Sequence, residues 1–332
     1  MFTSKTIILA LVLVWFASTN VHSETATNSS TGQLFKFKFK LNQPLIYAVQ
    51  FKSRTVSDNS AGNRSQLTRN SSELRYKIKL TAVSTNQDGT TTVYYEPYDY
   101  EQDAEIVGAS GRINTYYRGL DVVSRQNDIV MVDTTKGVGM SQAKNLKLGI
   151  YPFLLSGYFD FNPAGCVTRL DGDLPFMDHW KENLKFSAGV FQITFPTNII
   201  SVRDSWTNYI ILKNVAGVVF NGNGIVQSNV FTRELDSVAT NSSTATFSLY
   251  ESDIDHNVGG YIEQSGQQTS IVIHERTENA NATFHFDQKL GRLIDMKKTE
   301  KVTGSVSMMI QGNAATGHND NEVESSMQLV SP

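Results

Sequence analysis

The chain has 332 residues, of which 40% are hydrophobic, 18% are charged and 7 are proline, and its formal net charge is −3. This length suffices for one large β domain or two smaller ones, and the content of Tyr, Phe and β-branched residues favours strands over helices. The charge balance excludes an overall electrostatic attraction to nucleic acid, so no nucleic-acid partner is expected.

The N-terminus has the pattern of a signal peptide. Lys5 is the only charge before an apolar run from Ile7 to Ala17, and Val21-His22-Ser23 fits a cleavage site before Glu24. The apolar run is about half of the roughly 20 residues that a membrane-spanning helix needs, so export is favoured over an anchor. We therefore expect residues 1–23 to be removed. The mature chain is then periplasmic or secreted and has no transmembrane segment.

Cysteine and asparagine patterns point to different hosts. Cys166 is the only cysteine, so no intrachain disulfide forms and the fold depends on its core, as suits a bacterial envelope protein. Asn-x-Ser/Thr sequons would accept glycans in a eukaryotic host. The five sequons are at Asn28, Asn63, Asn70, Asn241 and Asn281.

The first part of the chain predicts an N-terminal β half over residues 34–170, after a disordered, polar lead-in at residues 24–33. Aromatic residues and lysines alternate from Phe35 to Leu41, which predicts a half-buried strand. Residues 57–71 are rich in Ser, Asn and Gly and predict a loop. The alternation returns over residues 74–80, and Asn86-Gln-Asp-Gly89 predicts a hairpin turn into the next strand.

The second part predicts a helical joint and a C-terminal β half. Asp171 and Pro175 suit the start of a helix over residues 171–189, which presents Phe176, Met177 and Trp180 on one face. Residues 190–312 again show short strands and turns. Residues 313–332 predict a frayed polar tail, within which residues 327–330 have the pattern of an edge strand. The predicted fold is all-β and mainly antiparallel, with two curved sheets or half-barrels and one short central helix.

One segment resembles a known protein family. Pro196 is followed by apolar residues and then by Val202-Arg-Asp-Ser-Trp206. This resembles the Pro…Val-x-x-Gly-Asp-Ser-Trp motif of exported bacterial β-rich proteins of uncharacterised function, although Arg203 stands where that family has Gly. Residues 283–310 resemble the family's closing hairpin. The resemblance implies a soluble, exported, all-β domain and brings no activity with it.

Metal-ligating residues are sparse. Asp253-Ile-Asp255-His-Asn257 begins like a calcium loop, but Val258 replaces the turn glycine and Gln264 replaces the bidentate Glu, so a solvated loop is favoured. His274-Glu275 and His285-x-Asp287 lie on predicted strands without a third ligand at metal spacing. We assign no metal site.

The sequence also lacks catalytic and cofactor motifs. It contains no Gly-x-Ser-x-Gly elbow, and Cys166 has no His near it in the sequence. Gly137-Val-Gly139 and Gly222-Asn-Gly224 lack the third glycine of a phosphate loop and predict turns. We therefore assign no catalytic or cofactor-binding residues and expect no cofactor, and a non-enzymatic protein is favoured over an enzyme.

Charged residues cluster in three places. Asp171 and Asp173 suit a helix start, whereas five carboxylates with Tyr98 and Tyr100 over residues 96–105 suit either a glycosidase groove or a solvated loop. Residues 36–79 form a basic region, in which Asp58 and Glu73 are the acidic residues. This region predicts either a surface for anionic envelope components or an ordinary solvated sheet face. Its ten Lys and Arg residues are at positions 36, 38, 40, 52, 54, 64, 69, 75, 77 and 79.

Three functions are compatible with these patterns. The favoured one is an exported, non-enzymatic protein that binds an apolar or lipid-like ligand between its sheets. The first alternative is a secreted hydrolase that acts on carbohydrate, which requires two carboxylates in one cleft. The second alternative is a surface interaction module that uses the basic sheet face.

Overall fold

The computed structural model describes residues 32–61, 64–148, 150, 156–171, 193–212, 214–215, 218–221, 225–234, 243–251, 254–264, 267–310 and 313–331. Within these ranges, 17 strands form one sheet, and every strand pairing is antiparallel. The all-β class with one short helix is confirmed. The strands join into a single continuous sheet in place of the two sheets expected.

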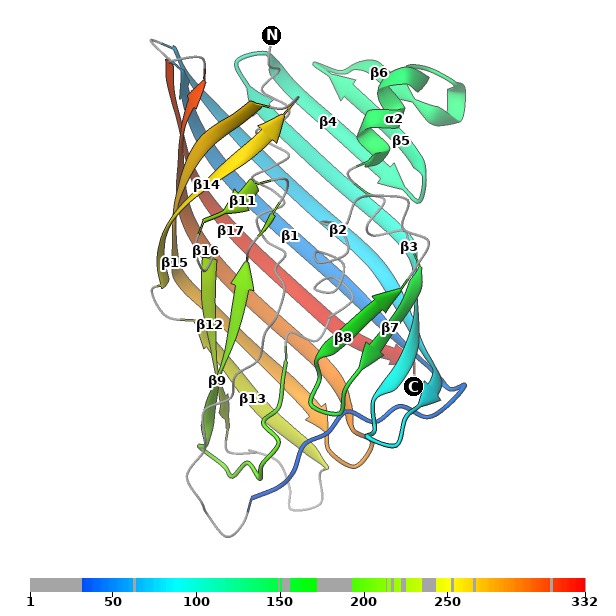
Figure 1. Cartoon of the computed structure of the whole chain (residues 1–332). Helices are drawn as coiled ribbons and strands as arrows, with labels where there is room; N and C mark the ends of the chain where they lie inside the picture. The colour runs from blue at the N-terminus through cyan, green and yellow to red at the C-terminus, as the bar shows by residue number, and fades with distance from the viewer. Residues whose placement is uncertain are drawn as a thin grey trace.

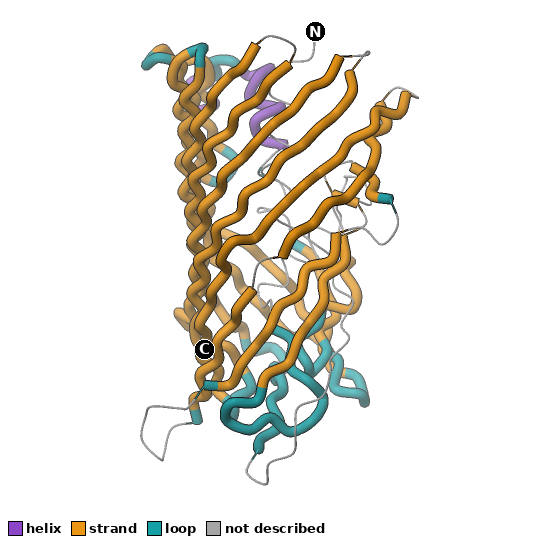
Figure 2. The backbone as a smooth tube through the Cα atoms, turned by 90° about the vertical axis from the view of Figure 1, so that its left-hand side faces the viewer, coloured by secondary structure: helices purple, strands orange, loops and turns teal. Residues whose placement is uncertain are grey.

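Six long strands lie side by side at the centre of the sheet (Figures 1 and 2). Each neighbouring pair but one is a hairpin, and the exception joins the first and last strands of the chain. In spatial order they are β15 (Gln267–Asp287), β16 (Arg292–Ile310), β17 (Asn313–Ser331), β1 (Pro44–Ala61), β2 (Arg64–Thr85) and β3 (Thr91–Gly108).

The sheet divides beyond β3, because the two halves of this strand pair with different partners. Its first half pairs with β7 (Gly157–Phe161), which is followed by β8 (Val167–Asp171). Its second half leads through β4 (Gly111–Arg118) and β5 (Asp121–Gln126) to β6 (Ile129–Asp133). The 3-10 helix η1 (Thr134–Lys136) and the helix α2 (Met140–Leu148) follow β6.

The opposite strand β15 divides in the same way. Its first half pairs with β14 (Ile254–Gln264), then β11 (Val218–Phe220) and β10 (Asn214–Val215). Its second half pairs with β13 (Thr244–Glu251), then β12 (Ile225–Arg233) and β9 (Ser205–Leu212). We call the end with β7, β8, β9, β12 and β13 the lower end and the other the upper end, as in Figure 1.

Strand periodicity gives the sheet an inner and an outer face. Tyr47, Ile78 and Met296 are buried on the face that we call inner, whereas Lys52 and Arg75 are exposed on the outer face. Each of the six central strands runs from one end of the sheet to the other. One part of its inner residues therefore lies at the lower end and the other part at the upper end.

Aromatic side chains fill the inner face at the lower end. The segment of residues 32–43 crosses this end (dark blue in Figure 1) and places Phe35 5.0 Å from Phe247 and Phe37 5.1 Å from Phe286, measured between ring centroids. Phe195 lies 4.9 Å from Phe286. Such contacts between buried rings add about 0.5–1.5 kcal/mol each to the burial of their apolar area.

The prediction of a strand over residues 35–41 is wrong in one respect. The alternation is present, because Phe35 and Phe37 are buried while Lys36 is exposed. The segment is not part of the strand ladder, however. The N–H of Phe37 donates to the carbonyl of Pro163, and the N–H of Lys38 donates to the carbonyl of Gly291. Both acceptors lie in turns, so the segment closes the end of the sheet and does not extend it.

Two segments that were predicted to be irregular are long strands. Residues 57–71 belong largely to β1 and β2, not to a loop, and residues 313–331 form β17 at the centre of the sheet, not a frayed tail. Both have small polar residues at the inner positions where a half-buried strand normally has apolar ones, so they lack the alternation of hydrophobic and polar residues that predicts a strand. The pairing of β17 with β1 and β16 supplies the backbone hydrogen bonds that hold it.

The predicted helical joint cannot be compared fully, because residues 172–192 lie outside the described ranges. Asp171 ends β8, and the rest of the predicted helix lies outside the described ranges. The helix that the structure describes is α2, which lies earlier in the chain. Within the described ranges, no helix is both long enough and apolar enough to span a membrane.

The segment around Trp206 forms a turn and a core anchor. Arg203 adopts a φ of 71°, the left-handed conformation that favours glycine, and the Asp204 carboxylate accepts a hydrogen bond from the Ser201 N–H at 2.7 Å. Trp206 stacks on Phe231 at 5.4 Å and donates from Nε1 to the Thr194 carbonyl at 2.7 Å. These contacts give the residues a structural role.

Candidate binding site on the inner face

The inner face changes from apolar to polar along each central strand. In β1, the lower inner residues are aromatic or aliphatic, and from Ser53 onwards they are small and polar. The lower set is Leu45, Tyr47, Val49 and Phe51, and the upper set is Ser53, Thr55, Ser57 and Asn59. The upper half of the inner face is therefore the part of the described sheet that is equipped for polar recognition.

Strand register aligns the polar residues in two rows, which we call the polar rows. In the first, Thr55 of β1 lies between Asn70 of β2 and Asn321 of β17. In the second, Ser57 lies between Thr68 and Asn319, and Gly304 of β16 lies on the far side of Asn319. Ser57, Thr68 and Asn319 are all buried. Because Gly304 has no side chain, Asn319 has no side-chain neighbour at the opposing position on β16.

Two acceptors in the polar rows are unsatisfied. Thr55 Oγ1 donates its one proton to Asn321 Oδ1 at 3.0 Å, so this hydroxyl has no proton left for Asn70. The Oδ1 atoms of Asn70 and Asn319 are shielded from solvent and have no hydrogen-bond partner. Asn319 is only 7% exposed. Buried acceptors of this kind are rare in native proteins and call for an explanation.

A hydrogen-bonded chain fixes the side of the polar rows towards β3. The Tyr100 hydroxyl donates to Gln102 Oε1 at 2.6 Å, and Gln102 Nε2 donates to Ser72 Oγ at 2.8 Å. Burial raises the pKa of Tyr100 far above its ordinary value of 10.0, so the hydroxyl remains a donor. Burial also raises the pKa of the neighbouring Tyr117, to about 12. The chain holds polar groups in fixed positions beside the first row.

Apolar side chains border the polar rows on both sides. Those on one side come from β15 and β16, and those on the other come from β4, β5 and β6; all are buried. The first group contains Ile271, Ile273, Val302 and Val306, and the second contains Tyr117, Val122 and Val132. The upper inner face therefore combines a central polar strip with two margins that are mainly apolar but also include Glu275 on β15 and the hydrogen-bonded Thr115 and Ser124.

A buried ion pair lies between the aromatic lower end and the polar rows. Lys298 Nζ is 3.0 Å from Glu300 Oε2, and the two side chains are 9% and 6% exposed. Their cross-strand neighbours on β17 are Ser325 and Val323. The pair adds polarity to the inner face, and the strand register places a further acidic residue, Glu275 of β15, at an inner position opposite Gly304.

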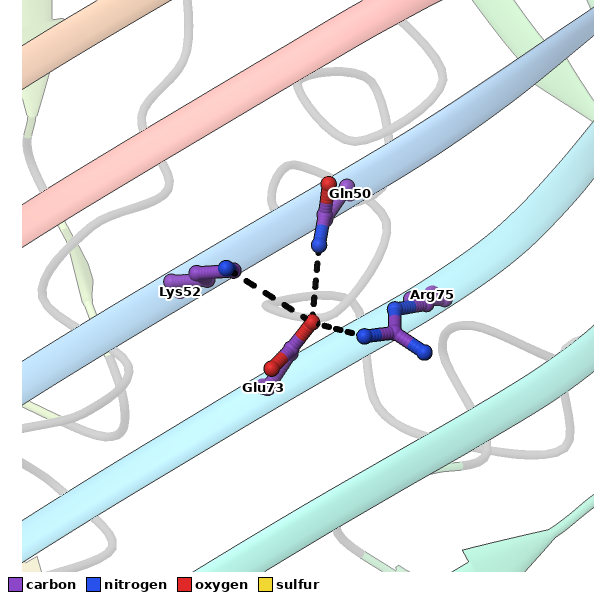
Figure 3. Close-up of polar contacts among 4 residues, drawn as sticks. All are labelled: Gln50, Lys52, Glu73 and Arg75. Atoms are coloured by element: carbon purple, nitrogen blue, oxygen red, sulfur yellow. Dashed lines mark hydrogen bonds and ion pairs between the residues drawn. The ribbon is translucent and has the colours of Figure 1, made fainter.

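The outer face carries the part of the basic region that lies on β1 and β2, together with carboxylates that pair with it. Glu73 accepts hydrogen bonds from Arg75 and from Gln50, and its Oε1 lies 3.8 Å from Lys52 Nζ (Figure 3). The hydrogen bonds from Arg75 and Gln50 lower the pKa of Glu73. Lys52 and Arg54 also lie opposite Glu324 and Glu322 of β17. Lys52, Arg54 and Arg75 therefore belong to a mixed-charge network, whereas Lys36, Lys38 and Lys40 lie on the segment of residues 32–43 and not on this face.

The acidic run of residues 96–105 lies in β3 and does not form a loop. Glu96 pairs with Lys79 at 3.1 Å, Glu101 with Arg118 at 3.6 Å and Glu105 with Arg112 at 2.8 Å. These carboxylates follow one another along the outer face. Because each has a basic partner on a neighbouring strand, they do not converge as a glycosidase pair does.

The remaining candidates occupy structural positions. Asp255 and Asn257 are paired residues of β14, and Asp253 lies outside the described ranges. His285 points away from the rings beside it, and its Nδ1 is 2.6 Å from Asp295 Oδ1. The part of the chain that the structure describes contains no cluster of three or more His, Cys, Asp or Glu side chains suited to a metal.

The thiol and the glycine pairs are also explained by local structure. Burial raises the pKa of the free Cys166, whose Sγ lies 3.7 Å from Thr194 Oγ1, so it is a poor nucleophile. Gly137 and Gly139 have φ values of 71° and 64° and form a turn, and Gly222 and Gly224 lie outside the described ranges. Of the sequons, Asn70 lies in the polar rows.

Comparisons with known proteins add little to this geometry. No protein-family model matches the chain, and no curated protein matches it. Among solved structures, an outer membrane channel from Pseudomonas putida F1 aligns over 91% of this chain and 99% of its own, with 6% sequence identity and a TM-score of 0.20. A similarity at this level supports no conclusion about function.

The polar rows were not predicted from the sequence. Ser53, Thr55, Ser57 and Asn59 recur at every second position, which is a strand period, but they are polar and the residues between them are mostly charged or polar. The available signal was chemical: the inner positions are uncharged and the outer ones include Arg54 and Asp58. A search for alternation of charge, as opposed to hydrophobicity, would have found the strand.

Proposed function

We propose that this protein is an exported, non-enzymatic binding protein that holds a small ligand against the upper half of its inner face. One observation carries the proposal: the buried Asn319 amide oxygen has no hydrogen-bond partner. An acceptor left in this state costs about 1–3 kcal/mol. A ligand that donates a hydrogen bond there would offset that cost, which explains why such a residue is kept inside the sheet.

The lower end is a poor place for the apolar or lipid-like ligand that the sequence favours. Its rings contact one another directly, as Phe35 and Phe37 contact Phe247 and Phe286. The protein's own segment therefore occupies the apolar surface. The upper end offers hydrophobic margins around a polar strip, so it suits a ligand that has both apolar and polar surface.

Export is supported by the signal-peptide pattern of residues 1–23, which lie outside the described ranges. The motif from Pro196 to Trp206 supports membership of the exported bacterial family that it resembles. Export is tested by N-terminal sequencing of protein from the native host, which should begin at Glu24. A chain that retains Met1 would overturn export.

Native mass spectrometry tests the binding role. Protein purified from its own host should carry a non-covalent mass in addition to the polypeptide. Ser57→Phe, which places a ring in the second polar row, should abolish this mass. Val56→Phe is the matched control, because Val56 is the neighbouring residue on the outer face and is exposed. Circular dichroism confirms that both variants fold. Absence of a carried mass, or equal retention in both variants, would contradict the proposal.

A further inference from the structure

We infer that the ligand is a saccharide or polyol whose hydroxyl groups donate hydrogen bonds to Asn70 and Asn319. This inference rests on the proposed binding role and specifies the chemistry of the ligand. It follows from which hydrogen-bonding groups are unsatisfied, from the charges around them, and from the distance between them.

The open groups are acceptors. Asn321 Oδ1 already receives the Thr55 proton, and Ser72 Oγ already receives a proton from Gln102, so these groups are satisfied within the protein. The oxygens of Asn70 and Asn319 remain without a donor. A ligand that complements them must present O–H or N–H groups, whereas the methyl and methylene groups of an acyl chain would leave both oxygens unsatisfied.

The charge on the inner face disfavours an anionic ligand. Lys298 and Glu300 form an ion pair at 3.0 Å, and Glu275 of β15 takes the next position of the second polar row, opposite Gly304. An anionic ligand would lose its hydration beside this acidic position, which is strongly unfavourable. The polar rows otherwise contribute only Ser, Thr and Asn side chains. Hydroxyl groups suit this surface because each donates and accepts, as Ser57 and Thr68 do.

The spacing requires several donors on one ligand. Asn70 and Asn319 lie on strands separated by β1 and belong to successive inner rows. Strands are about 4.8 Å apart and residues rise about 3.3 Å, so the two backbones are roughly 12 Å apart. A single hydroxyl cannot reach both oxygens. A molecule with hydroxyl groups distributed over an extended frame, such as a disaccharide, can reach both and can also contact Ser57 and Thr55 between them.

The test begins with the identity of the carried molecule, determined by accurate mass and fragmentation after release from the native protein. Ligand-free protein is then titrated calorimetrically with that molecule, with maltose, cellobiose and N,N′-diacetylchitobiose, and with palmitic acid as the apolar probe. Asn319→Leu and Asn70→Leu should each weaken saccharide binding about tenfold or more, because a ligand hydroxyl then faces a methyl group. Asn114→Leu, on the outer face of β4, should leave the affinity unchanged.

The outcomes separate this inference from the proposed function. A carried acyl lipid, or binding of palmitic acid with an affinity that Asn319→Leu does not change, overturns the saccharide inference and leaves the binding role standing. No carried molecule and no titration signal from any probe overturns both. A saccharide whose affinity falls in both inner-face variants and not in Asn114→Leu supports both.

Discussion

The two ends of the inner face are made by the same central strands and are both buried, yet the lower end is packed with aromatic rings and the upper end carries rows of polar residues. At the lower end, the Tyr47 hydroxyl is buried and donates to the Leu293 carbonyl at 3.0 Å. At the upper end, the buried Asn319 oxygen has no donor. Burial alone therefore does not indicate a stabilising residue. The lower end is packed with rings, although Asn208 Oδ1 and Arg292 Nε are also unsatisfied there, whereas the upper end places its unsatisfied acceptors among other polar residues at the expense of stability.

The comparison predicts the largest loss of stability at the lower end. Phe284 is completely buried and stacks on Phe247 at 4.9 Å. Phe284→Ala should lower the free energy of unfolding by about 3–5 kcal/mol, because it leaves a cavity among rigid rings. Urea unfolding measures this value. Val272→Ala, at an exposed position of the same strand, should change it by less than about 0.5 kcal/mol. Similar losses in the two variants would contradict a structural role for the aromatic end.

The ion pair at the boundary should show strong coupling. Lys298→Met removes the ammonium that lies 3.0 Å from the buried Glu300 carboxylate and should cost about 3 kcal/mol. The double variant Lys298→Met/Glu300→Leu should recover part of that loss, since it removes both charges together. A double-mutant cycle in urea measures the coupling. Losses that simply add would show that the two charges act independently.

The outer face should contribute least. Glu73 is partly exposed, and Glu73→Gln should cost less than about 1 kcal/mol, with a smaller effect in high salt. The pKa of Glu73 in the folded protein is lowered from 4.5, so its contribution is present above that value and is lost as the pH falls through the folded-state pKa. Thermal melts from about pH 6 to about pH 3 should converge for wild type and variant in acid. A constant difference across this range would exclude ionised Glu73 as the cause.

Sequence patterns predicted the parts of the fold that rely on local chemistry. The alternation around Phe35 and Phe37 identified buried rings, and the turn at Asn86–Gly89 forms the β2–β3 hairpin, with Gly89 at a φ of 86°. The pairing of β1 with β17 was not predictable, because its register joins residues from opposite ends of the chain and no local turn specifies it. The polar rows were missed for a related reason. Their residues become neighbours only after that pairing forms.

The most direct test compares two asparagines of β17 in ligand-free protein by urea unfolding. Asn321 Oδ1 accepts a hydrogen bond from Thr55, whereas Asn319 Oδ1 has no donor. Asn321→Leu should therefore lower the free energy of unfolding by about 1 kcal/mol, and Asn319→Leu should raise it by about 1 kcal/mol, because an unsatisfied buried acceptor is removed. If Asn319→Leu destabilises the protein as much as Asn321→Leu does, Asn319 is an ordinary structural residue. The upper inner face would then not be a binding surface.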